Sequence, residues 1–152
     1  MGRRLKRLGK YVLSEPIYEN LLQQLVSIEE QKEQQIDNFL CTSPRERDEC
    51  IQMLKRYLTC LDQVLRTAER NNTAQDEVPF VTVDSYVLLY DYETNTTDEF
   101  RVISPFSEKA EFNDISFLSP LGKKLLMKRV DEEVVVEAPG GTFKYRIESI
   151  RM

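Results

Sequence analysis

Apolar residues recur between residues 51 and 68 at alternating spacings of three and four, and this pattern constrains the fold more than any other feature of the chain. The positions that follow it are Ile51, Leu54, Leu58, Leu61, Leu65 and Ala68. Such spacing places all of these side chains on one stripe of a helix, whereas a strand repeats every two residues. A helix with one apolar stripe buries that stripe against another element. The segment therefore predicts a helix with a packing partner.

A shorter pattern of the same kind lies upstream. Leu21, Leu25 and Ile28 keep the spacing of four and then three, and the stripe turns polar at Lys32 and Gln35. This pattern predicts a first helix whose apolar side chains gather near its start.

A short break separates the two helices that these patterns predict between residues 14 and 71. Ser14 is suited to cap the first helix. Ser43 is suited to cap the second, with Pro44 at its first position and Glu46 completing a capping box. A break of two or three residues forces the helices antiparallel. The prediction is a helical hairpin with arms of about 26 residues, or about 39 Å at 1.5 Å per residue.

The composition is that of a globular protein, with 41% hydrophobic and 31% charged residues in a chain of 152. This length holds one medium domain or two small ones. No apolar run approaches the roughly 20 residues that a membrane-spanning helix needs, and the apolar run at residues 11–13 is too short for a signal peptide. We expect a cytoplasmic protein without a membrane partner.

Charge is divided unevenly along the chain. Residues 1–75 carry a net charge of +1, and residues 76–152 carry −6. A chain with this balance is a poor candidate for binding DNA by itself. The basic residues near the start are Arg3, Arg4, Lys6, Arg7 and Lys10. They form either a solvated tail or an arm that contacts phosphates or a protein partner.

The chain has no histidine, and its cysteines are Cys41, Cys50 and Cys60. Ser-His-Asp catalysis, Cys-His catalysis and zinc sites with histidine ligands are therefore excluded. The spacing of the cysteines matches no zinc motif. Cys41 and Cys50 flank the hairpin tip, so they either form a redox pair or remain inert helix thiols.

The second half of the chain predicts strands rather than long helices. A polar stretch at residues 71–77 is typical of a linker. Strands are predicted at 80–91 and 99–103 around a turn at 92–97, followed by a loop at 104–113. A short strand then begins at Asp114, a helix covers 120–128, and a hairpin closes at Pro139-Gly140-Gly141. Phe143, Tyr145 and Ile147 alternate along the return strand and predict a half-buried face.

Two motifs in this region carry a family resemblance. The string ISFLSPLGKKLL occupies residues 115–126, and DEEVVVEAPGG occupies residues 131–141. In this order they resemble the C-terminal domain of bacterial Gre transcript-cleavage factors, over about residues 78–150. The resemblance implies an α+β protein. An N-terminal antiparallel coiled-coil hairpin would lie within residues 1–75, and an FKBP-like domain of antiparallel strands with one short helix would occupy residues 76–152.

The resemblance also implies a docking site for RNA polymerase at Ser119, Pro120, Leu121 and Gly122. The same residues predict a helix start, with Ser119 as the cap and Pro120 at the first position, which keeps Pro120 and Leu121 near the surface. Four basic residues follow: Lys123, Lys124, Lys128 and Arg129. They either meet an acidic partner surface or form a solvated face.

In the family, two acidic residues at the hairpin tip help to hold a catalytic magnesium ion inside the polymerase. Glu46 matches the second of these positions, but Ser43 stands at the first and carries no carboxylate. Asp48 and Glu49 lie further along the helix, on different sides of it. The arms are also shorter than the family pattern by about ten residues in total, or roughly 7 Å of reach. Efficient transcript cleavage is therefore not expected.

The function that the resemblance implies is an RNA polymerase-binding regulator of transcription elongation that inserts its hairpin into the secondary channel. We expect no catalytic residue, metal site or cofactor of its own, because any magnesium would be shared with the polymerase active site. We also expect a monomer that meets nucleic acid only through the polymerase complex. Two alternatives remain open: a true cleavage-stimulating factor and an FKBP-like adaptor for other proteins. Prolyl isomerase activity is disfavoured, because fold alone does not carry activity and the chain has no tryptophan.

Overall fold

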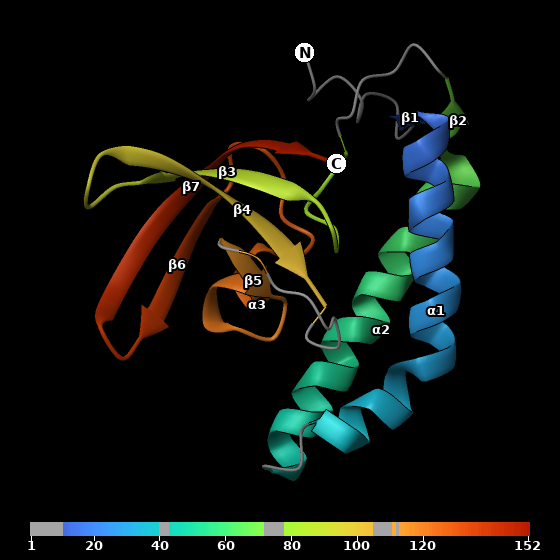
Figure 1. The fold of residues 1–152 in the computed structure, drawn as a ribbon, viewed down its shortest axis with the longest axis horizontal. Coiled ribbons are helices and arrows are strands. Elements are labelled where there is room, and N and C mark those ends of the chain that lie inside the picture. The colour runs from blue at the N-terminus through green and yellow to red at the C-terminus, as the bar shows by residue number, and fades with distance from the viewer. Residues whose placement is uncertain (1–10, 40–42, 72–77, 105–110, 112) are drawn as a thin grey trace. The chain divides into compact units, whose positions relative to one another are not determined.

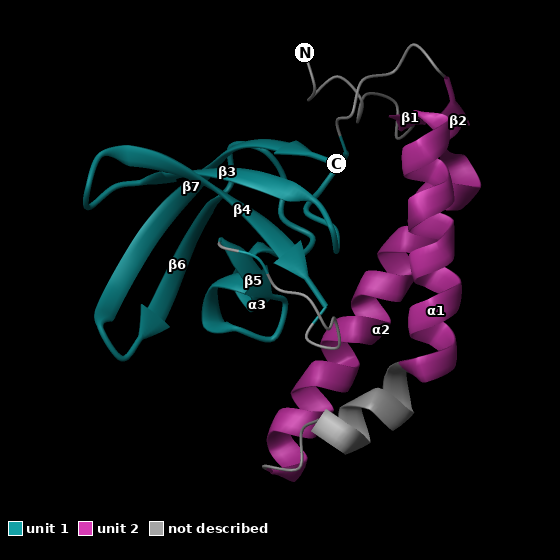
Figure 2. Ribbon diagram, in the orientation of Figure 1, with its two compact units in different colours: residues 1–8, 75–152 teal, residues 9–74 magenta. Residues whose placement is uncertain are grey.

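The computed structural model describes residues 11–39, 43–71, 78–104, 111 and 113–152, with the backbone alone for residues 32–39. The chain forms two compact units, whose described parts lie within residues 9–74 and 75–152 (Figure 2). The first unit is a helical hairpin and the second is built on a five-stranded sheet (Figure 1). The α+β class predicted from the sequence is confirmed. No helix within the described ranges is long and apolar enough to cross a membrane.

The hairpin consists of α1 (Glu15–Phe39) and α2 (Pro44–Thr67) (Figure 1). Both predicted helix starts are confirmed. The Ser14 hydroxyl accepts a hydrogen bond from the Ile17 amide at 3.4 Å, and the Ser43 hydroxyl accepts one from the Glu46 amide at 3.1 Å. These bonds satisfy backbone donors that have no partner inside the helix.

The apolar stripe predicted on α2 is buried at its centre, but the buried face is wider than predicted. Leu54, Leu58, Leu61 and Leu65 are buried, whereas Ile51 and Ala68 are only partly buried. A second row is also buried, consisting of Cys50, Met53, Tyr57 and Val64. The Tyr57 hydroxyl crosses to α1, where it donates to the Gln24 side-chain oxygen at 2.6 Å. A buried tyrosine normally finds such a partner, and this pairing has no signature in the spacing of apolar residues.

The base of the hairpin differs from the prediction. The second helix ends at Thr67 rather than near residue 71, and β2 (Glu69–Arg70) runs parallel to β1 (Val12–Leu13). The Glu69 amide donates to the Tyr11 carbonyl oxygen at 2.8 Å, and the Asn71 amide donates to that of Leu13 at 2.9 Å. Two-residue strands are too short to show a periodicity, so the sequence pattern could not reveal them.

Truncation of Leu58 to alanine should destabilise the hairpin by about 2–5 kcal/mol, the usual cost of removing a buried leucine side chain. Gln52→Ala is the matched control, because Gln52 lies on the same helix and is exposed. The free energy of unfolding, followed by helical circular dichroism, should fall for Leu58→Ala and stay within about 0.5 kcal/mol for Gln52→Ala. Equal losses would mean that the buried face of α2 is assigned wrongly.

The second unit contains the sheet β5-β4-β3-β7-β6 and one short helix. Its elements are β3 (Tyr86–Asp91), β4 (Thr96–Ile103), β5 (Asp114–Ser116), α3 (Pro120–Leu125), β6 (Glu133–Ala138) and β7 (Gly141–Arg151). The expected antiparallel pairing holds for β3 with β4, β3 with β7 and β6 with β7, but β5 pairs with β4 in parallel. A parallel pair needs a crossover connection, and the chain between β4 and β5, residues 104–113, lies largely outside the described residues.

Two predicted elements are shorter in the structure. The strand predicted at 80–91 begins only at Tyr86, because a buried turn precedes it, in which the Ser85 hydroxyl donates to the Thr82 carbonyl oxygen at 2.7 Å. The helix predicted at 120–128 ends at Leu125. Beyond it the Met127 amide donates to the Val81 carbonyl oxygen at 2.9 Å. A local turn therefore decides the first boundary, and a partner distant in the sequence decides the second.

The hairpin predicted around Pro139 is confirmed, since Ala138 pairs with Gly141. Along β7 the predicted alternation holds up to Ile147, which is buried, and a β-bulge then shifts it. Leu88 pairs with Ser149, but the next residue, Leu89, pairs with Ile147. The bulge turns Ile150 to the buried side as well.

Candidate functional sites at the Ser119 turn and the hairpin tip

The Ser119 turn joins β5 to α3 and is held by hydrogen bonds between its own residues. The Ser119 hydroxyl donates to the Ser116 carbonyl oxygen at 2.6 Å and accepts from the Gly122 amide at 3.1 Å. Pro120 occupies the first helical position and is exposed, and Leu121 is partly exposed. A cap satisfied in this way leaves Pro120 and Leu121 on the outside of the turn. The turn thus offers a small apolar surface on a rigid support.

Gly122 lies in the same turn but faces the interior. A Cβ atom at Gly122 would lie 2.0 Å from the Ser116 carbonyl oxygen, far inside contact distance. The absence of a side chain therefore allows α3 to pack against the end of β5. Of the four residues that the sequence assigned to docking, Ser119, Pro120 and Leu121 reach the surface. Gly122 is buried and shapes the turn from within.

An ion pair that no sequence pattern indicated anchors the strand leading into this turn. Arg101 on β4 makes two hydrogen bonds to the Asp114 carboxylate on β5, at 3.1 and 2.6 Å. The guanidinium hydrogen bond is the main cause that lowers the pKa of Asp114, and the Glu111 amide adds to it. Charge-assisted pairs with two bonds fix geometry as well as charge. They hold β5, and with it the start of the Ser119 turn.

Basic residues surround the end of α3. Lys123, Lys124 and Arg129 are exposed and Lys128 is partly exposed. The Arg129 amide is held by the Glu132 carboxylate at 3.1 Å. An acidic partner surface could therefore reach these cations.

At the hairpin tip, the hydroxyl of Ser43 is engaged as the helix cap. Glu46, Asp48 and Glu49 are exposed on the first turns of α2. Glu49 pairs with Arg45 at 3.4 Å. At 3.6 residues per turn, Glu46 and Asp48 point to nearly opposite sides of the helix.

Among the residues that the structure describes, at the tip and elsewhere, no group of three or more His, Cys, Asp or Glu side chains could hold a metal ion. Cys50 is buried, and Cys41, its candidate redox partner, lies outside the described residues.

Comparisons with known proteins match the second unit most clearly. A family model described as "Transcription elongation factor, GreA/GreB, C-term" matches residues 75–152. Transcription elongation factor GreA of Thermosipho melanesiensis is 33% identical over 72 residues, which make up 47% of this chain and 46% of that protein. GreA of Desulfotalea psychrophila is 28% identical over 99 residues, 65% of this chain and 62% of that protein. The chain thus spans about half the length of the first of these relatives.

Solved structures similar to this chain are also Gre-type proteins. A GreA/GreB elongation factor from Nitrosomonas europaea superposes with a TM-score of 0.46 at 22% identity, over 94% of this chain and 98% of that one. GreA factor homolog 1 of Thermus thermophilus superposes with a TM-score of 0.42 at 22% identity, over 93% of this chain and 98% of that one. The family assignment does not depend on them. Because the family model covers more than half of the chain, the protein belongs to the GreA/GreB family of transcription elongation factors.

Proposed function

We propose that this protein binds RNA polymerase through the Ser119 turn, places its helical hairpin in the secondary channel and modulates elongation without efficient transcript cleavage. Membership of the Gre family supports the polymerase as the partner. The exposed Pro120 and partly exposed Leu121 on a well-supported turn suit a protein contact. In this proposal the polymerase supplies the chemistry, and the protein is a regulator rather than an enzyme.

The main observation behind the proposed lack of cleavage is the role of the Ser43 side chain. Its hydroxyl serves as the cap of α2, and a neutral hydroxyl does not replace a carboxylate as a ligand of a hard divalent cation. Asp48 does not repair this deficit, because it leaves the helix on nearly the opposite side from Glu46. Glu49 shares a face with Glu46, but it pairs with Arg45 at 3.4 Å. A magnesium ion needs its oxygen ligands at about 2.0–2.1 Å, so a carboxylate on the wrong side of the helix contributes little.

The resemblance adds an argument from reach, because it implies arms about ten residues shorter in total than the family pattern. The two helices have 25 and 24 residues, so each arm spans about 37 Å at 1.5 Å per residue. A tip that stops several ångströms short of an active site cannot donate a ligand, but the arm can still occupy the channel that leads to it.

The test compares the unmodified protein with variants of the tip in stalled polymerase complexes that contain magnesium. Ser43→Asp should gain partial cleavage activity, and Ser43→Asp with both arms lengthened by one helical turn should gain more. Ser43→Asn is the matched control, because asparagine caps a helix as well as aspartate does but carries no charge. The rate of RNA shortening is the measurement, and the unmodified protein and Ser43→Asn should add little to it.

The unmodified protein should also displace a cleaving Gre factor from the polymerase. Strong cleavage by the unmodified protein, lost in Glu46→Ala or Asp48→Ala, would make the tip a ligand donor and refute the proposal. Failure to bind polymerase at all would instead favour an adaptor for another protein.

A further inference from the structure

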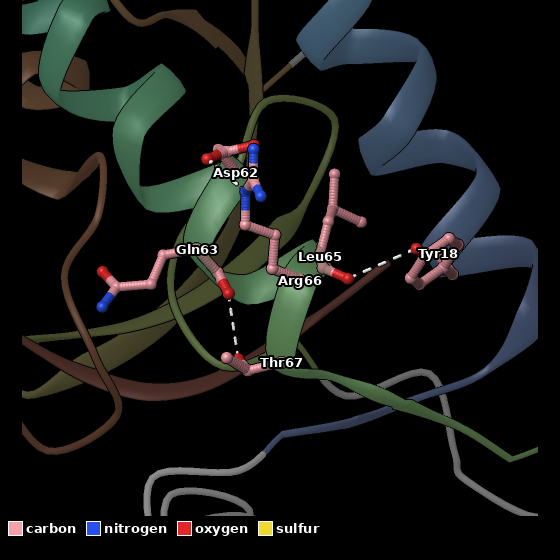
Figure 3. Close-up of polar contacts among 6 residues, drawn as sticks. All are labelled: Tyr18, Asp62, Gln63, Leu65, Arg66 and Thr67. Carbon is pink, nitrogen blue, oxygen red and sulfur yellow. Dashed lines mark hydrogen bonds and ion pairs between the residues drawn. The ribbon is translucent and has the colours of Figure 1, made fainter.

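Tyr18 on α1 joins the two ends of the hairpin. Its hydroxyl donates to the Leu65 carbonyl oxygen at 3.3 Å (Figure 3). Leu65 lies in the last turn of α2, where carbonyl groups have no amide partner within the helix. The Glu69 amide, which would be the helical donor to the Leu65 carbonyl, instead donates to the Tyr11 carbonyl oxygen. Tyr18 therefore satisfies an acceptor that the end of α2 leaves open.

Arg70 on β2, which follows α2 in the chain, contacts the same tyrosine. Its guanidinium carbon lies 4.1 Å from the centre of the Tyr18 ring, within the range of a cation–π interaction. A guanidinium nitrogen also lies 3.7 Å from the Glu15 carboxylate at the start of α1. The backbone thus links β1 to β2, and these side chains link the start of α1 to β2.

Neighbouring polar side chains of α2 do not make such a link. Arg66 pairs with Asp62 at 2.9 Å, and the Thr67 hydroxyl donates to the Gln63 carbonyl oxygen at 2.9 Å (Figure 3). Both of these contacts stay within α2. Arg66 thus provides a cation of the same type, four residues from Arg70, whose salt bridge to Asp62 lies within its own helix.

We propose that Tyr18, Arg70 and Glu15, together with the β1–β2 pair, form a basal clasp that fixes the start of α1 against the end of α2 and so sets the position of the hairpin tip. This inference rests on the proposed function. Tyr18 and Arg70 are positioning residues, because they act on the tip through the rigidity of the arm.

The length of the arm explains why its base matters. A change of about 10° in the angle between α1 and α2 at the base displaces the end of an arm of about 37 Å by roughly 6 Å. Short parallel pairs and exposed ion pairs are weak when isolated. The tyrosine that bridges them makes one cooperative unit out of several weak contacts.

The first experiment measures amide hydrogen exchange in the full chain without polymerase. Arg70→Ala should accelerate exchange of the Glu69 and Asn71 amides roughly fivefold, which corresponds to about 1 kcal/mol. Tyr18→Leu removes both the ring and the hydroxyl and should do at least as much, whereas Tyr18→Phe keeps the ring and should have a smaller effect. Arg66→Ala is the matched control and should leave both amides unchanged. Equal exchange in Arg70→Ala and Arg66→Ala would overturn the clasp.

The second experiment separates docking from positioning. Arg70→Ala and Tyr18→Leu should compete for polymerase with the same midpoint as the unmodified protein, within about twofold, because the Ser119 turn is intact. Their effect on the rate of RNA extension at saturating concentration should fall by at least half, and Arg70→Lys should restore part of it. An undiminished effect at saturation in variants with faster exchange would refute the positioning role. If the unmodified protein does not bind polymerase, the proposed function fails, and the exchange data alone decide whether the clasp exists.

Discussion

Replacing Gly122 with alanine should lower the free energy of unfolding of the second unit by about 3 kcal/mol or more, the upper part of the range for overpacked positions. The added Cβ atom would lie 2.0 Å from the Ser116 carbonyl oxygen and 2.9 Å from the Phe117 Cα atom. Both neighbours are backbone atoms, so no side chain can rotate away. Either α3 moves outward or β5 separates from β4, and each change disrupts the Ser119 turn.

Gly140→Ala is the matched control for this change. A Cβ atom at Gly140 would meet only the end of the Phe143 ring at 3.6 Å, an ordinary contact, so the loss should stay below about 1 kcal/mol. Chemical denaturation of the full chain, followed through amide signals of β3 and β7, gives both values. A Gly122→Ala variant as stable as Gly140→Ala would mean that α3 does not approach β5 as closely as described.

Replacing Leu121 with glutamate should weaken polymerase binding at least tenfold, which corresponds to about 1.4 kcal/mol. Leu121 is partly exposed beside Pro120 on the outside of the Ser119 turn, so it can be buried at an interface without unfolding the protein. A carboxylate there would have to lose its water on binding without gaining a partner. A few apolar residues near the centre of an interface usually dominate its affinity.

Val135→Glu provides the comparison for Leu121→Glu. Val135 is an apolar residue of β6 that is 47% exposed, so the same charge is added to the same unit at a different place. Competition against a labelled Gre factor should show weaker binding for Leu121→Glu and unchanged binding for Val135→Glu, with circular dichroism confirming that both variants are folded. Equal affinities would move the docking surface away from the Ser119 turn.

The features that could be predicted from the sequence are those encoded by neighbouring residues. Ser14, Ser43 and Ser119 each precede a helix, and each hydroxyl accepts a bond from the amide three residues on. A cap depends on four consecutive residues, so its pattern is visible in one short string. The Pro139 turn is likewise encoded in one short string, and the central leucines of α2 are marked by their regular spacing along one segment.

The features that escaped prediction depend on partners far apart in the chain. Tyr18 meets Arg70, β1 meets β2, and Arg101 meets Asp114 only after the chain has folded. The bulge in β7 also belongs to its pairing with β3 rather than to its own composition. For the candidate sites, the sequence indicated which residues form the Ser119 turn and which lie at the hairpin tip. It did not distinguish the exposed Pro120 from the buried Gly122, because burial is a property of the packed turn.

The adjacency of β1 and β2 has a consequence for how this protein can vary. β1 precedes the hairpin and β2 follows it, and the two strands lie side by side. Residues can therefore be added to or removed from both helices in equal number without moving either junction with the rest of the protein. Arm length is then a quantity that selection or an engineer can adjust by itself, in steps of whole helical turns of about 5.4 Å. A change in arm length of this kind would leave the Ser119 turn and the base of the hairpin as they are.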